Sequence, residues 1–145
     1  MKEEFELVEH IHKDASMAVY TLEKLLKNLQ ERDNKIKGFV EEILQKYEEY
    51  VKVSKEELEK NNIVPTEEGI IAKMMSSMGI SKEVKEDNSD ASIADMLIKG
   101  ISMGSIEMEK KIKDYDKEVD KNHLKLAKDF LKFQEKTINE LKKYL

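Results

Sequence analysis

Two histidines in the sequence each follow a carboxylate by three positions, at Glu9-x-x-His12 and Asp120-x-x-His123. In an α-helix this spacing places the two side chains about one turn apart on nearly the same face, so that they can share one metal ion. Imidazole and carboxylate ligands together suit Fe, Mn or Zn. With Glu107, these residues make up the candidate metal site: Glu9, His12, Glu107, Asp120 and His123.

The same spacing also arises by chance in a Glu-rich helical chain. In that interpretation each histidine caps a helix end or makes a partly exposed hydrogen bond, and the acids lie in solvent. His10 lies two positions off the apolar stripe described below and is expected at the surface. The sequence contains no recognisable nucleophile–base pair and no Gly-rich phosphate loop, so it indicates no catalytic residues and leaves open whether the protein is an enzyme.

The length and composition of the chain limit which folds and which kinds of site it can form. The 145 residues suit a single domain over residues 1–145, with one Pro and five Gly, too few turn residues for a many-stranded sandwich or barrel. The chain has no Cys, which excludes disulfides, thiolate zinc sites and iron–sulfur clusters. A cytoplasmic location is the expectation that follows from this and from an acidic N-terminus unlike a signal peptide.

Charge and hydropathy argue against two kinds of partner. The net charge is −5, and the 26 basic residues include a single arginine, Arg32, with the lysines interleaved among acids. This pattern is typical of a solvated helix surface and predicts no nucleic-acid binding. No run of 18 apolar residues occurs, so we expect no membrane-spanning helix and no membrane partner.

Apolar residues with helical spacing predict an all-α protein with four long helices, at about residues 2–30, 34–61, 91–114 and 118–145. The stripe of the first helix contains Val8, Ile11, Ala15, Ala18, Leu22, Leu25 and Leu29. Four polar residues at 31–34 favour a turn between the first two helices, with Asp33 as a cap of the second. The alternative is one unbroken helix, because the stripe passes through Asp33 in register.

The connection at about residues 62–90 decides how the two helical hairpins are joined. Pro65 ends the second helix, and Thr66 starts a short helix that ends near Gly79. Simple connections in helical bundles take only about 2–8 residues. The longer connection therefore predicts a crossover along the bundle, with the second and third helices parallel and His12, His123 and Glu107 near one end.

Two stretches, Ile98–Glu107 and Leu131–Leu141, resemble a group of small, uncharacterised ferritin-like four-helix-bundle proteins of bacteria. The resemblance implies a ferritin-like bundle of two hairpins with a long crossover. Di-iron members of the wider class carry Glu on two helices and Glu-x-x-His on the other two. Here Glu9-x-x-His12 is the single such motif, the second helix has no His, and the fourth has Asp120 before His123.

Two functions remain as hypotheses. The first is a ferritin-like bundle that binds Fe, Mn or Zn through His and carboxylates, and the alternative is a non-catalytic structural or interaction bundle that self-associates. Met74, Met75 and Met78 in the crossover indicate either core packing or the interface of a homodimer. Gly100 and Gly104 are expected on the core face, where they let two helices approach closely.

Overall fold

A computed structural model of the chain describes residues 2–65, 89–115, 117 and 119–145. These residues form four α-helices, and no strand occurs among them: α1 (Glu6–Asn28), α2 (Lys37–Lys60), α4 (Asp90–Tyr115) and α5 (Lys121–Leu141), with 3-10 helices at Lys2–Phe5 and Lys142–Tyr144. The prediction of an all-α bundle with four long helices is confirmed. The expected short helix from Thr66 to Gly79, with Met74, Met75 and Met78, lies outside the described residues.

The turn between the first two helices is confirmed, because α1 ends at Asn28 and α2 begins at Lys37. The alternative of one unbroken helix through Asp33 is therefore wrong. The predicted cap is also wrong, since Ile36 occupies the cap position of α2 and no side chain there accepts a hydrogen bond. The turn is held instead by Asn34, whose Nδ2 donates to Asp90 Oδ1 at 2.9 Å.

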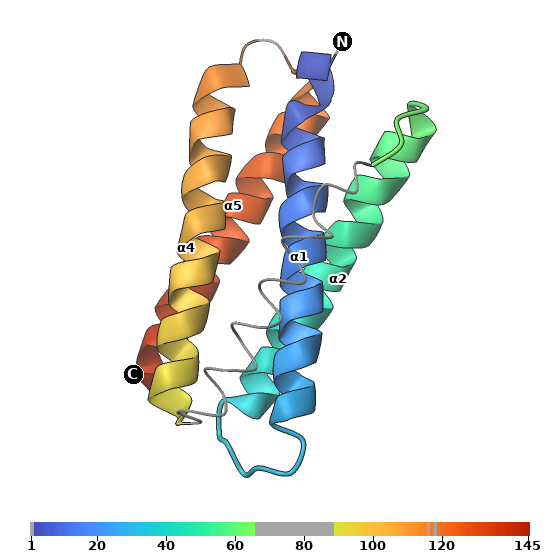
Figure 1. Cartoon of the computed structure of the whole chain (residues 1–145). Coiled ribbons are helices and arrows are strands. Elements are labelled where there is room, and N and C mark those ends of the chain that lie inside the picture. The colour runs from blue at the N-terminus through green and yellow to red at the C-terminus, as the bar shows by residue number, and fades with distance from the viewer. Residues whose placement is uncertain (1, 66–88, 116, 118) are drawn as a thin grey trace.

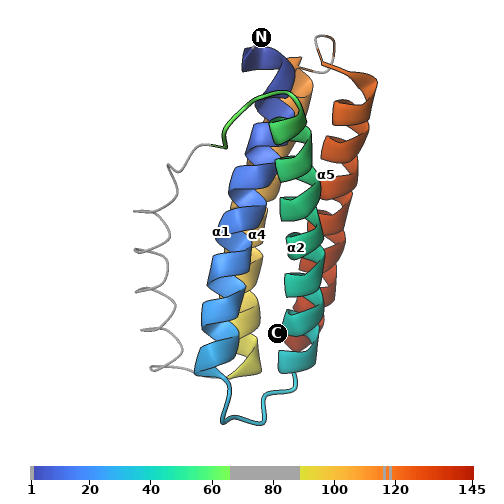
Figure 2. The same ribbon diagram turned by 90° about the vertical axis from the view of Figure 1, so that its right-hand side faces the viewer.

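The Asn34–Asp90 bond places the start of α4 beside the turn between α1 and α2 (Figure 1). The helix α2 leaves this end of the bundle and α4 leaves it in the same direction, whereas α1 and α5 both run toward it (Figures 1 and 2). The end of α2 and the start of α4 consequently lie at opposite ends of the bundle.

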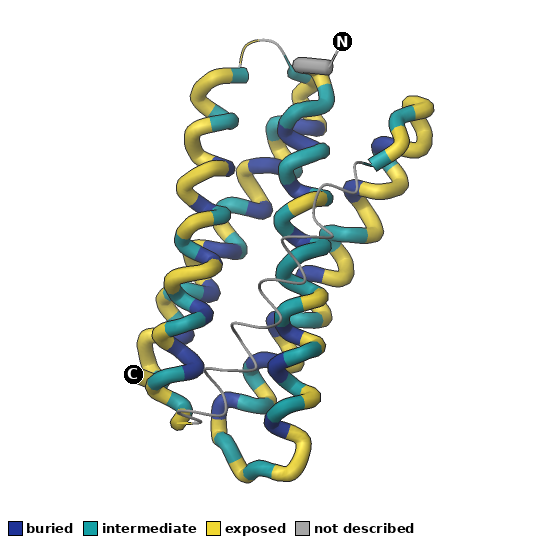
Figure 3. The backbone as a smooth tube through the Cα atoms, in the orientation of Figure 1, coloured by how far each residue is buried: buried dark blue, intermediate teal, exposed yellow. Residues whose placement is uncertain are grey.

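The apolar stripes form one core along the axis, and the buried faces of the helices point inward (Figure 3). Most residues of the predicted α1 stripe are fully buried: Val8, Ile11, Ala15, Leu22, Leu25 and Leu29. Burial of one Leu or Ile side chain contributes about 1.5–3 kcal/mol to folding. Tertiary packing of these stripes, more than helix propensity, is what stabilises helices with so many exposed charges.

The helices are unequally spaced. The helix α1 packs against all three others, most extensively against α2, and α4 packs most extensively against α5. Aromatic rings fill the space between α2 and α5: Tyr47 meets Phe133 edge-on with ring centroids 4.9 Å apart, and Tyr50 meets Phe130 at the same separation. These large rings therefore hold α2 and α5 apart.

In the part of the chain that the structure describes, no helix combines the length and the apolarity needed to cross a membrane.

Candidate functional site

Two of the predicted metal ligands reach the same stretch of α2. His12 Nδ1 lies 3.3 Å from Ser54 Oγ, and His123 Nε2 lies 2.9 Å from Glu57 Oε1. Ser54 and Glu57 are three positions apart on α2. We call these four residues (His12, Ser54, Glu57 and His123) the end cluster, because they lie toward the end of the bundle where α1 and α5 begin.

Hydrogen bonds in the end cluster are well matched. The Ser54 hydroxyl donates to the Tyr50 carbonyl at 2.7 Å, so its oxygen accepts from His12 Nδ1. His123 Nδ1 faces the Glu4 carbonyl at 3.2 Å while its Nε2 faces the Glu57 carboxylate. Each ring nitrogen of His123 therefore faces an oxygen that can accept a hydrogen bond.

The other predicted ligands have different surroundings. Asp120 caps α5, and its Oδ1 accepts from Asn122 N at 2.7 Å. Glu107 is exposed on α4, 3.7 Å from Lys110 Nζ. Glu9 is half-buried on α1. Nowhere in residues 2–65 or 89–145, as far as these are described, do three His, Asp or Glu side chains gather closely enough to hold a metal ion. The five-residue metal site stays a prediction.

A second group of polar side chains lies inside the bundle and draws on all four helices. We call it the central cluster: His10 and Asp14 on α1, Tyr47 on α2, Gly104 on α4 and Gln134 on α5. Gln134 Nε2 donates to Asp14 Oδ2 at 2.8 Å and to the Tyr47 hydroxyl at 3.2 Å. The prediction that His10 lies at the surface is wrong, since its side chain is 11% exposed.

Gly104 makes room for the Asp14 carboxylate. A Cβ built on Gly104 would lie 2.9 Å from Asp14 Cγ, closer than real contacts allow. The His10 ring also makes a hydrogen bond with the Gly104 backbone. The expectation that Gly104 permits close approach is thus met, whereas Gly100 is exposed and a Cβ there would meet nothing within 4 Å, so the same expectation for Gly100 is wrong.

Burial dominates the electrostatics of the central cluster. It raises the pKa of Asp14 to about 6, against the hydrogen bond from Gln134, which lowers it. It lowers the pKa of His10 to about 4, helped by the positive charge of Lys111. Burial and the Asp14 charge both raise the pKa of Tyr47. Each shift favours the neutral form, as expected for ionisable groups removed from water.

Two buried polar atoms of this cluster, His10 Nε2 and Gln134 Oε1, have no hydrogen-bond partner among the described residues. His10 Nε2 lies 3.8 Å from Asp14 Oδ2. An imidazole nitrogen, an amide oxygen and a carboxylate in one buried cluster can accept hydrogen bonds or coordinate a cation.

Sequence reasoning missed this cluster although one signal was present. His10 and Asp14 are four positions apart, which places them on one face of a helix. The apolar stripe alone did not include that face. The helix α1 is buried more widely than its stripe because α4 approaches it at Gly104.

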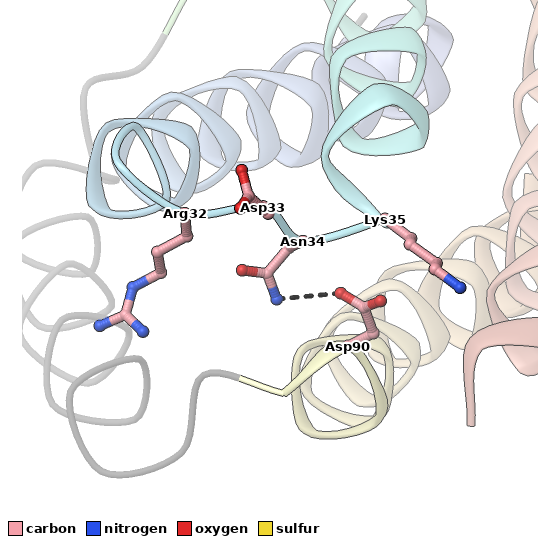
Figure 4. A pocket seen from close by; sticks show the side chains of 5 residues that line it. All are labelled: Arg32, Asp33, Asn34, Lys35 and Asp90. Atoms are coloured by element: carbon pink, nitrogen blue, oxygen red, sulfur yellow. Dashed lines mark hydrogen bonds between the residues drawn. The ribbon is translucent and has the colours of Figure 1, made fainter.

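The described residues also form two open pockets at the surface. One lies at the α1–α2 turn, lined by Arg32, Asp33, Asn34, Lys35 and Asp90 (Figure 4). Its centre is occupied by the Asn34–Asp90 bond, and the Arg32 and Lys35 side chains point away to either side. The other is an open groove between α2 and α5, where lysines and acids alternate around Phe39, Tyr50 and Phe133.

Comparison of the chain with protein-family models, with curated proteins and with solved structures finds no match.

Proposed function

We propose that this protein is a metal-binding helical bundle that holds one divalent transition-metal ion at the central cluster. The observation that carries the proposal is the buried Nε2 of His10, which has no hydrogen-bond partner among the described residues and lies 3.8 Å from the Asp14 carboxylate. Imidazole nitrogen and carboxylate oxygen are both ligands of divalent transition metals.

The spacing of the two candidate ligands fits a shared ion. Bonds from Zn²⁺ are about 2.0–2.1 Å long to histidine nitrogen and about 2.0–2.2 Å long to carboxylate oxygen, so these two ligand atoms of one ion lie at most about 4.3 Å apart. His10 Nε2 and Asp14 Oδ2 are 3.8 Å apart. The hydrogen bond from Gln134 Nε2 holds the Asp14 carboxylate in place, and its unpartnered Oε1 is available as a further oxygen ligand.

A cation would also remove an electrostatic cost. A buried carboxylate without a nearby positive charge is unfavourable, which is why burial raises the pKa of Asp14. A bound cation would favour the ionised form of Asp14 and would be coordinated by the lone pair of His10 Nε2. Imidazole with carboxylate suits Fe, Mn or Zn, the metals expected from the sequence.

The proposal includes a ferritin-like arrangement of the helices. It is supported by the parallel course of α2 and α4 and by the placement of the end of α2 and the start of α4 at opposite ends of the bundle. Ferritin-like folds contain one such long crossover and build metal sites from side chains on facing helices. A cytoplasmic location is part of the same proposal.

Thermal unfolding of chelator-treated protein, with and without added Zn²⁺, Mn²⁺ or anaerobic Fe²⁺, tests the proposal. At a metal concentration of about 100 times Kd, binding to the folded state alone contributes about 2.7 kcal/mol, and Tm should rise. His10→Gln and Asp14→Asn should each abolish the rise while leaving the helical circular dichroism signal intact.

His12→Gln is the matched control, since His12 lies on the same helix but belongs to the end cluster. A metal effect that survives His10→Gln and disappears with His12→Gln would contradict the proposal and favour the five residues predicted from sequence. No effect of any of the three metals on the unmodified chain would also contradict it, and would leave the non-catalytic bundle as the better explanation.

A further inference from the structure

The outer face of α4 combines features that the fold of a single chain does not explain. Met103 is 72% exposed and Ile106 is 52% exposed, and they are three positions apart on the same helix. Gly100, three positions before Met103, is also exposed, and a Cβ there would meet no atom of the described residues within 4 Å. Glycine inside a helix costs about 1 kcal/mol relative to alanine, and no packing among the residues that the structure describes offsets this cost.

We infer that this face of α4, which we call the α4 face (Lys99, Gly100, Met103, Ile106 and Glu107), is an interface with the α4 face of a second copy of this chain, packed antiparallel about a two-fold axis at Met103. The two-fold symmetry requires residues equally far from Met103, on its two sides, to meet across the interface.

The pairs that this symmetry produces are complementary in shape. Ile106 of each copy faces Gly100 of the other, so that the largest apolar side chain beside the axis meets the position that has no side chain. Small residues let helix backbones approach closely, which gives the glycine its role. Met103 packs against its own copy at the axis, where the flexible thioether side chain adapts to fill the gap.

The same pairs are complementary in charge. Lys99 of each copy faces Glu107 of the other, so each of these contacts joins opposite charges. A parallel arrangement would instead place each charge opposite its own copy, which is repulsive. Within the chain, Lys99 forms an exposed ion pair with Asp95 at 2.8 Å and Glu107 one with Lys110 at 3.7 Å. Exposed pairs of this kind contribute little, so they can rearrange in a dimer at small cost.

Sedimentation of the full chain from low micromolar to near-millimolar concentration is the first test, and we expect a reversible monomer–dimer equilibrium. Lys99→Glu should raise the dimer dissociation constant about tenfold through two like-charge contacts, and Glu107→Lys should do the same. The double variant Lys99→Glu/Glu107→Lys restores opposite charges and should recover most of the affinity.

Site-directed crosslinking gives an independent test, because the chain has no cysteine of its own. Met103→Cys places a thiol on the proposed two-fold axis and should form a disulfide-linked dimer under mild oxidation. Tyr20→Cys, at the exposed Tyr20 of α1, is the matched control and should crosslink far more slowly.

A monomer at every concentration would overturn the inference, as would equal crosslinking at positions 103 and 20. A dimer that withstands Met103→Glu but dissociates with Met74→Gln/Met75→Gln would place the interface in the crossover and would overturn it too. Because the α4 face is separate from the central cluster, these outcomes do not depend on whether the protein binds metal.

Discussion

The central cluster and the end cluster both place a histidine near a carboxylate, yet they differ in how completely their hydrogen bonds are satisfied. In the end cluster both ring nitrogens of His123 face acceptors, the Glu57 carboxylate and the Glu4 carbonyl. In the central cluster His10 Nε2 has no partner among the described residues, and the nearest carboxylate oxygen, of Asp14, is 3.8 Å away. A histidine whose ring nitrogens both face hydrogen-bond acceptors is typical of a residue that stabilises the fold. Buried polar atoms without a partner are rare in folded proteins and call for a further explanation.

The two histidines are similarly buried, with side chains 8% exposed for His123 and 11% exposed for His10. The sites differ in the carboxylate: the Glu57 side chain is 32% exposed and bonds to its histidine, whereas that of Asp14 is 19% exposed and does not. Removal from water shifts the pKa of both central groups toward their neutral forms. The central cluster therefore depends on pH and on added cations in ways that can be measured.

The largest expected effect is on the pH dependence of stability, measured by denaturant unfolding in the presence of a chelator. Asp14 has a raised pKa in the folded state, about 6 against 3.8, so the folded chain binds more protons and acidification through this range stabilises it. His10 has a lowered pKa, about 4 against 6.5, so the unfolded chain binds more protons and acidification destabilises the fold.

In the unmodified chain these two contributions should nearly cancel between about pH 4 and pH 6. Asp14→Asn should leave only the His10 contribution, so the free energy of unfolding should fall by about 2 kcal/mol as the pH is lowered from 6 to 4. His10→Gln should leave only the Asp14 contribution, so the free energy of unfolding should instead rise by about 2 kcal/mol over the same change of pH, which makes the two variants differ by about 4 kcal/mol. If the free energy of unfolding of the two variants changed with pH in the same way, the pKa shifts of Asp14 and His10 would not come from burial in a shared site.

Gly104→Ala should have the next largest effect. Although alanine favours a helix by about 1 kcal/mol, its Cβ would collide with the Asp14 carboxylate, and we expect a net loss of about 2 kcal/mol in the free energy of unfolding. In an Asp14→Ala background the collision disappears, and the same change should stabilise by up to about 1 kcal/mol. Gly100→Ala, measured at low micromolar concentration, is the control and should also stabilise. If the effects of Gly104→Ala and Asp14→Ala on the free energy of unfolding simply add in the double variant, Gly104 does not accommodate Asp14.

The smallest effect is expected in the end cluster, for Glu57→Gln. The amide still reaches His123 but loses the charge of the acceptor, and because the site is partly exposed we expect a loss of about 1 kcal/mol. Glu56→Gln, at an exposed neighbouring position, should change the free energy of unfolding by less than about 0.5 kcal/mol. Metal-induced stabilisation should be the same in both variants, since neither residue belongs to the central cluster.

Periodicity predicted the helices well because each long helix carries a nearly unbroken apolar stripe. The turn at residues 29–36 was also predictable, because a run of polar residues interrupts the chain where the stripe alone does not. The length of the connection predicted that α2 and α4 run in the same direction, as they do in Figure 1. These are local properties or properties of chain length, and the sequence contains them directly.

The polar contacts between helices were not predictable in the same way. Glu57 belongs to the charged face of α2, and its spacing does not distinguish it from the exposed acids nearby that lie in solvent. Asp120 has suitable spacing from His123 but is used as the cap of α5. His10 is buried because another helix meets α1 at a glycine, and that meeting depends on tertiary packing rather than on the sequence of α1.

The packing of the helices in pairs has a consequence for how the protein folds. Contacts within each hairpin join segments close in sequence, whereas the bond between Asp14 and Gln134 joins residues 120 positions apart. Since closing a long loop costs entropy before its contacts form, each hairpin should assemble first and the two should dock afterwards. The central cluster would then form at docking, where a wrong register leaves Asp14 buried without its amide donor. Gln134→Leu should accordingly speed unfolding and leave the refolding rate nearly unchanged in stopped-flow measurements, and slower refolding would show that the hairpins meet before the transition state.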